Sequence, residues 1–131
     1  MRTLLIAIML AFWAAPALAE ELVPYGCSDV VVLGRLENLD YAHQDIPDDL
    51  LGHGWMTARV HVRRVVKGGE RRRVVPLRYF GHTYLRHDRT FLLVMSREKD
   101  GYELKSATLA SGGARPGLEA ACRPDQPAAL P

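Results

Sequence analysis

The sequence predicts an all-β domain, a small antiparallel barrel of five strands, with a β-sandwich as the alternative. Stretches rich in β-branched and aromatic residues, bounded by turn-forming residues, follow one another over residues 29–109. Hardly any of this region favours a helix. Within the second expected strand the apolar alternation shifts by one residue, as it does at a β-bulge. Bulges bend long strands, and bent strands are typical of a barrel.

The first 19 residues have the pattern of a secretory signal peptide. A basic start at Arg2, an apolar run over residues 4–15 and small residues up to Ala19 form its three parts. The run is shorter than the roughly 20 residues that span a bilayer. We therefore expect cleavage before Glu20, a secreted or periplasmic protein, and no transmembrane span after cleavage. The remaining residues fit one domain over 20–123, followed by a flexible tail over 124–131.

The first two expected strands cover residues 29–39 and 55–66. The apolar run at residues 30–33 predicts burial on both faces of the first strand. An acidic loop follows at 40–54, in which a proline and the acids after it suit one helical turn at 47–51. In the second strand the shift of the apolar alternation by one residue predicts a bulge near Arg63 and Arg64.

The other expected strands complete the barrel. Residues 67–70 form a turn into a third strand at 71–80, where Pro76 requires an edge or an unpaired position because it has no backbone donor. Residues 90–96 are the most apolar stretch after the signal and predict a central strand. An Asp-Gly pair within residues 98–101 predicts a hairpin turn into a fifth strand at 102–109. Residues 118–122 suit one helical turn.

The chain contains two cysteines, Cys27 and Cys122. Exported proteins fold in an oxidising compartment, so we expect one disulfide that joins the start of the domain to its end.

Charge is segregated along the chain. Residues 20–58 carry eight acidic and one basic side chain, a net charge of −7, whereas residues 59–89 carry ten basic and two acidic side chains, a net charge of +8. Such segregation creates either a basic patch or two halves that neutralise each other in the folded domain. We favour mutual neutralisation.

Several short motifs resemble the netrin-like domain of the tissue inhibitors of metalloproteinases. They are Ser-Asp-Val-Val-Val-Leu-Gly from Ser28, Ala-Arg-Val-His-Val from Ala58, Val-Val-Lys-Gly from Val65 and Phe-Leu-Leu-Val from Phe91. The resemblance covers roughly residues 27–109 and implies an OB-like barrel. It does not extend to the inhibitory chemistry. Those inhibitors place an N-terminal cysteine on the protease zinc, and here the expected N-terminus is Glu20.

The residues indicate binding and not catalysis. No serine, carboxylate or cysteine motif of an enzyme is present, and we expect neither cofactor nor metal. We predict a non-enzymatic module of bacterial envelope type with a protein partner. The first alternative is a binder of an anionic polymer or glycan, and the second is a metal-dependent hydrolase using His82, His87 and Asp88. An exported protein is not expected to bind nucleic acid. The candidate binding face consists of the arginines of the basic segment: Arg59, Arg63, Arg71, Arg72, Arg73 and Arg78.

Overall fold

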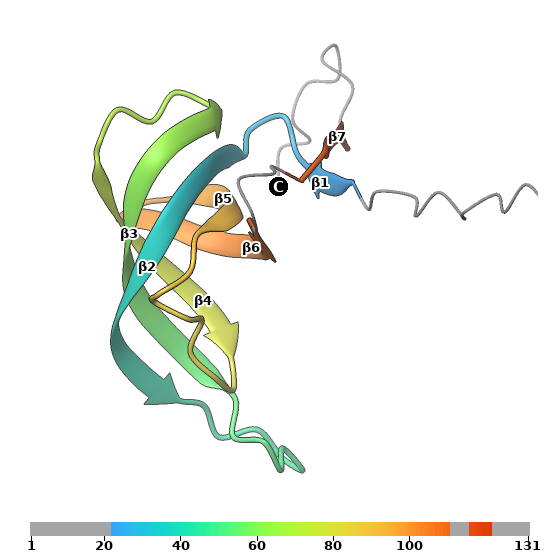
Figure 1. Ribbon diagram of the computed structural model, residues 1–131. Coiled ribbons are helices and arrows are strands. Elements are labelled where there is room, and N and C mark those ends of the chain that lie inside the picture. Colours follow the sequence, from blue (N-terminus) through green and yellow to red (C-terminus); the bar gives the residue numbers. More distant parts are fainter. Residues whose placement is uncertain (1–21, 111–115, 122–131) are drawn as a thin grey trace, which may run out of the picture.

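The computed structural model describes residues 22–110 and 116–121, and within these ranges every regular element is a strand (Figure 1). The strands are β1 (Val23–Tyr25), β2 (Val30–His43), β3 (Gly54–Lys67), β4 (Val74–Gly81), β5 (Phe91–Glu98), β6 (Gly101–Leu109) and β7 (Leu118–Ala120). The predicted signal peptide, the predicted tail and Cys122 lie outside the described residues. The described part of the chain contains no helix of the length and apolarity needed to cross a membrane.

Five strands close into an OB-like barrel in the order β2-β3-β4-β6-β5. This confirms the predicted barrel, and the sandwich alternative was wrong. The barrel is mixed and not wholly antiparallel, because β4 and β6 run parallel while the other neighbouring strands run antiparallel. The parallel pair arises because β5 leaves β4 to pair with β2, and the β5–β6 hairpin then returns β6 to the free edge of β4.

The long strands β2 and β3 bend around the barrel through bulges (Figure 1). Leu33 pairs with Arg64 and Gly34 with Val62, so Arg63 is the extra residue. The shift in the apolar alternation of this strand predicted a bulge at this place. Further shifts lie at Val66 of β3 and at Leu39 of β2. The bulges bend both strands strongly, which a five-stranded barrel needs in order to close.

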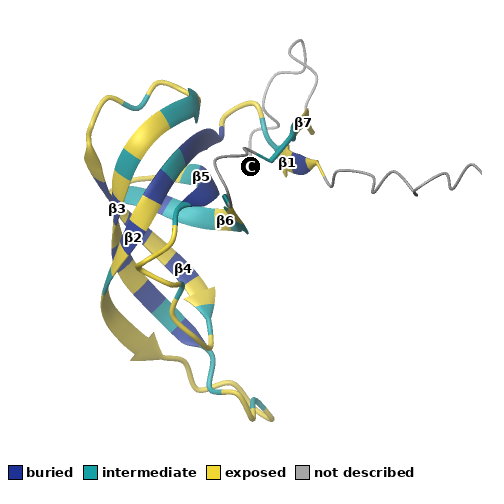
Figure 2. Ribbon diagram, viewed as in Figure 1, coloured by how far each residue is buried: buried dark blue, intermediate teal, exposed yellow. Residues whose placement is uncertain are grey.

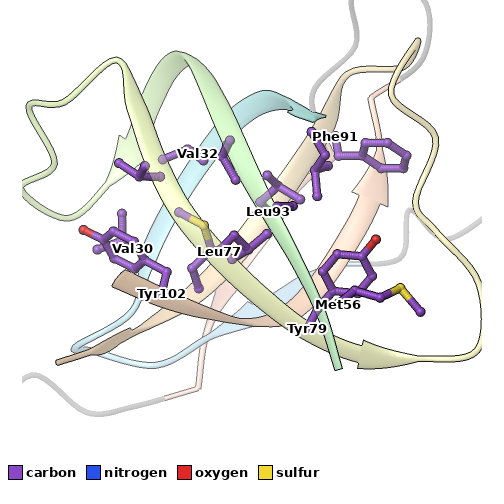
Figure 3. Packing of buried hydrophobic residues seen from close by; sticks show 13 residues of the cluster. Val30, Val32, Met56, Leu77, Tyr79, Phe91, Leu93 and Tyr102 are labelled. Carbon is purple, nitrogen blue, oxygen red and sulfur yellow. The ribbon is translucent and has the colours of Figure 1, made fainter. Parts of the chain in front are cut away.

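Inward-facing side chains of all five barrel strands form the main core (Figures 2 and 3). The largest contributions come from Leu36, Met56, Leu93, Met95 and Tyr102, each at most 2% exposed. A second cluster lies outside the barrel wall, where Val31, Leu92 and Val94 pack against Val23 of β1. The predicted burial on both faces is therefore confirmed for residues 30–32, whereas Leu33 is half-buried, and β5 is central as expected.

Two predicted helical turns are absent. Residues 118–120 form β7, which pairs in parallel with β1, so its hydrogen bonds come from a partner at the other end of the sequence. Residues 47–51 form a turn and a bend, because the Asp49 carboxylate accepts the local backbone donors that a helical turn would otherwise use. The predicted lead-in before residue 29 also contains a strand, β1, which is too short to show a periodic pattern.

The third strand begins later than predicted. It starts at Val74, and residues 71–73 belong to the loop that joins β3 to β4. Its faces are as expected, with Val75, Leu77 and Tyr79 buried. Pro76 is tolerated because the pairing of β4 with β6 begins only after it.

A polar network holds the connection between β4 and β5 against the barrel. The Tyr79 hydroxyl donates to Asn38 Oδ1 over 2.7 Å and accepts from the Leu85 amide over 3.1 Å. Asn38 Nδ2 donates to the Leu85 carbonyl over 2.8 Å. The residues between β4 and β5 are thereby fixed to β2 and β4 without a strand of their own.

Candidate binding groove

A groove of about 510 Å³ lies along the outside of β3 and β4 and ends at the β5–β6 hairpin. Its residues come from β2, β3, β4, β5, the hairpin and the start of β6: Leu39, Thr57, Ala58, Arg59, Pro76, Leu77, Arg78, Glu98, Lys99, Asp100, Gly101 and Tyr102. Apolar surface predominates in it. A concave apolar surface with a few polar groups is typical of a ligand site.

Strand alternation sets which side chains reach this groove. Thr57 and Arg59 of β3 point outward between buried neighbours, and Pro76 and Arg78 do the same on β4. Their register places Arg59 beside Pro76 and Thr57 beside Arg78. These four side chains therefore form two adjacent rows along the groove.

Gly101 allows the hairpin to approach β4 closely. A Cβ atom at this position would lie 2.8 Å from both Cγ and the carbonyl oxygen of Pro76. Only glycine fits so near the strand without a shift of the backbone. The hairpin consequently becomes one wall of the groove.

The arginines of the groove are neutralised within the chain. Arg78 lies 2.6 Å from Glu103 and 3.9 Å from Glu98, and its guanidinium is 4.7 Å from the centre of the Trp55 ring. Arg59 lies 3.7 Å from Glu37. Because both arginines have an anion nearby, and Glu98 and Asp100 line the groove together with Lys99, the groove presents balanced charge and not a basic field.

The other arginines of the predicted binding face lie elsewhere. Arg63 is the bulged residue of β3, whereas Arg71 and Arg73 are exposed in the loop before β4. Arg72 is bound to Glu70, with Nη2 of the arginine 3.0 Å from Oε2 of the glutamate. Of the six predicted residues, Arg59 and Arg78 are the two that line the groove.

Glu70 organises the loop between β3 and β4, a role that the sequence pattern did not indicate. Its side chain is only 4% exposed and accepts hydrogen bonds from the amides of Arg71 and Arg72, the Arg72 guanidinium and the Tyr102 hydroxyl. The Arg72 hydrogen bond and, to a lesser extent, that of Tyr102 lower the pKa of Glu70 to about 2. Burial, followed by the contact with Glu70, raises the pKa of Tyr102.

Asp49 plays a similar part in the loop between β2 and β3. Its carboxylate accepts from the backbone amides of Leu51, Gly52 and His53 and contacts the His53 ring, with Oδ1 2.9 Å from Nδ1. The backbone and side chain of His53 lower the pKa of Asp49 to about 2. Asp49 is thus a structural residue. The sequence did not single it out, because it lies among other acidic residues.

The proposed hydrolase residues have other partners. His82 lies edge-on to His53 with ring centres 5.0 Å apart, and Asp88 pairs with Arg86 over 2.7 Å. His87 borders a second groove of about 500 Å³ beside β2. Nowhere in residues 22–110 or 116–121 do three or more ligating side chains gather around a position that could hold a metal ion.

No protein-family model matches the sequence, and no significant match was found among curated proteins or solved structures.

Proposed function

We propose that this chain is an exported, non-enzymatic binding module that holds an extended segment of a protein ligand in the groove outside β3 and β4. The observation that carries the proposal is an open, mainly apolar groove whose two arginines are already paired with anions. An extended peptide offers apolar side chains to such a floor and backbone groups to its polar rim. A polyanion would have to displace the internal carboxylates.

The position of the groove on the barrel supports the same proposal. In OB-type barrels, ligands bind on the face of the second and third strands and between the loops that join strands one to two and four to five. Here the second and third barrel strands are β3 and β4, and the hairpin at Lys99 and Asp100 joins the fourth to the fifth. The fold indicates where a ligand binds, and the residues of the groove indicate which ligand.

The test uses peptides selected by display against the immobilised protein and measured by isothermal titration calorimetry. Thr57→Trp should abolish their binding, because Thr57 is exposed on the groove and a tryptophan there fills it. Thr83→Trp is the matched control, since Thr83 is exposed outside the groove. Unchanged affinity for the Thr57 variant, or equal loss in both variants, would contradict the proposal.

A basic end of the barrel makes an anionic polymer or glycan the second candidate ligand. Arg63, Arg71 and Arg73 are exposed and make no ion pair with another described residue, and Lys67 ends the adjoining strand β3. Binding of heparin to this end should weaken as salt is raised, because exposed charges are screened. It should also weaken when the three arginines become alanine. Substitution of Arg86, an arginine paired with Asp88, should change little, and equal losses for both changes would exclude the basic end.

The disulfide between Cys27 and Cys122 belongs to the same proposal of an exported domain. Strands β1 and β7 pair in parallel with a constant offset of 95 positions (118 − 23), and the two cysteines have the same offset (122 − 27). The pairing continues past the strands, since the Ala121 amide donates to the Tyr25 carbonyl over 2.8 Å. The netrin-like relationship likewise stays a proposal, supported by its motifs and by the OB-like barrel.

A further inference from the structure

The second groove, beside β2, adjoins the groove outside β3 and β4, which we call the first groove. The residues that line the second groove are Arg35, Leu36, Glu37, Asn38, His61 and His87. Strand register brings the two grooves together, because Glu37 on β2 lies opposite Arg59 on β3, and Arg59 lies opposite Pro76 on β4. Each of these three side chains is exposed and follows a buried residue, so all three point away from the core. The row therefore crosses the outside of three adjacent strands, from the first groove to the second (Figure 1).

Arg35 gives the second groove a cation without an anion. Its side chain is exposed and makes no ion pair or hydrogen bond with any other residue in 22–110 and 116–121. Glu37, the acid of this lining, already lies 3.0 Å from His61 Nε2 and 3.7 Å from the Arg59 guanidinium. In the first groove, by contrast, both arginines have a carboxylate nearby. An anion can therefore bind Arg35 without displacing a carboxylate of the chain.

The connection between β4 and β5, which contributes to the second groove, is fixed before a ligand arrives. Asn38 lines the groove and donates to the Leu85 carbonyl, and the Tyr79 hydroxyl bonds both residues, as described above. His87 follows two residues later and completes the lining. Its ring makes no hydrogen bond or ion pair within the described ranges, so it can bond a ligand that reaches Arg35. A preformed site spares the complex the entropic cost of ordering the protein.

We propose that the extended ligand of the first groove continues over the Glu37–Arg59 pair and places an acidic side chain on Arg35. The inference rests on the proposed function and adds a requirement to its ligand. A guanidinium is planar and binds a carboxylate through two parallel hydrogen bonds. The second groove has a volume of about 500 Å³, which leaves room for the ligand chain to continue beyond a single carboxylate. We therefore assign the carboxylate to a side chain and not to the end of the ligand.

The spacing of the strands sets where the acid lies in the ligand. Two strand spacings, or roughly 10 Å, separate Pro76 from Glu37, and Arg35 lies two residues from Glu37 along β2, or roughly 7 Å. The distance from Pro76 to Arg35 is therefore about 12 Å. An extended chain advances about 3.3 Å per residue, so about four residues separate the ligand side chain over Pro76 from the acid. Side chains four positions apart lie on the same side of an extended chain, as this contact requires.

The test uses the peptides selected by display for the first groove, measured by isothermal titration calorimetry. They should contain an acidic residue about four positions from an apolar one. Replacing that acid by its amide should weaken binding to the wild type by about two- to fivefold, the range of a partly exposed ion pair. The same replacement should change nothing on Arg35→Gln, which has lost the cation, and Arg35→Lys should keep part of the difference. Arg64→Gln is the matched control and should respond like the wild type, since Arg64 is exposed on β3 and lines neither groove.

Several results would overturn the inference while the first groove keeps its function. They are selected peptides without such an acid, a loss on Arg35→Gln equal to that on the wild type, and an Arg64→Gln variant as insensitive as Arg35→Gln. A C-terminal amide that weakens binding to the wild type but not to Arg35→Gln would assign Arg35 to the end of the ligand and also overturn it. In each of these cases Thr57→Trp still abolishes binding. Binding that survives Thr57→Trp, or a selection that yields no peptide, would instead overturn the proposed function and the inference with it.

Discussion

Replacing Glu70 by glutamine should destabilise the domain by an amount that depends on pH. The substitution keeps the shape of the side chain but turns an acceptor-only group into one with an amide. At the position of Oε2 that amide would face the Tyr102 hydroxyl and the Arg72 guanidinium, and the latter has only donors to offer. Glu70 is almost fully buried, so the lost partners cannot be replaced by water.

The size of the effect follows from the pKa of Glu70. One pKa unit corresponds to about 1.4 kcal/mol, so lowering the pKa from 4.5 to about 2 sets an upper bound of about 3 kcal/mol. The side chain of Arg72 is 55% exposed, so solvent weakens its contribution, and we expect about 2 kcal/mol at neutral pH. For a domain of this size that loss lowers the melting temperature by roughly 10 °C.

The direction of the pKa shift determines how the stabilisation by Glu70 depends on pH. Because the folded-state pKa lies below the ordinary value, the stabilisation is complete above about pH 4.5 and is lost as the pH falls through about 2. Urea denaturation of the wild type and the Glu70→Gln variant should be measured from pH 7 to pH 2.5. The difference between their free energies of unfolding should become smaller as the pH falls.

Glu37→Gln is the control for this experiment. Glu37 also contacts cations, Arg59 and His61, but its side chain is 47% exposed, so the change should alter stability by less than about 0.5 kcal/mol. A Glu70 variant as stable as the wild type, or a gap that is the same at every pH, would refute the reasoning.

Three further predictions concern other parts of the fold. Tyr79→Phe should cost about 1–3 kcal/mol in the free energy of unfolding and speed hydrogen exchange at the Leu85 amide, which loses its acceptor; unchanged exchange would contradict the network. Gly34→Ala should destabilise by about 1–3 kcal/mol in urea denaturation, because the new Cβ would lie 2.8 Å from the His61 carbonyl oxygen, and a neutral result would mean that β3 yields easily. Cys122→Ser should cost up to about 4 kcal/mol under oxidising conditions and nothing in excess reductant, and an equal loss in both would rule out the disulfide.

Local patterns in the sequence were sufficient for most of the strands. The apolar alternation of β3 predicted its inward face, and the shift of this alternation by one residue located the bulge at Arg63. Both follow from the sequence because the two-residue period of a strand is a property of the backbone itself. The Asp-Gly pair predicted the β5–β6 hairpin, and Pro76 predicted a gap in pairing, for equally local reasons.

The elements that the sequence did not predict depend on pairing partners that are distant along the chain. Strands β1 and β7 have three residues each and exist because they pair with one another across the length of the domain. The parallel contact of β4 with β6 extends over two residue pairs, too few to leave a pattern in either strand.

The sequence by itself determined an all-β fold and the segregation of acidic from basic side chains along the chain. The closed barrel, and not the sandwich, was decided by the structure. The tertiary structure alone decided which charges meet. It pairs Arg59 with Glu37 and Arg78 with Glu103, and it buries Glu70, one of two acids in the basic segment, against Tyr102. Sequence spacing fixes the face on which a side chain lies, whereas the strand order of the closed barrel fixes its neighbours. The groove, which needs three strands and a hairpin side by side, exists only at that level.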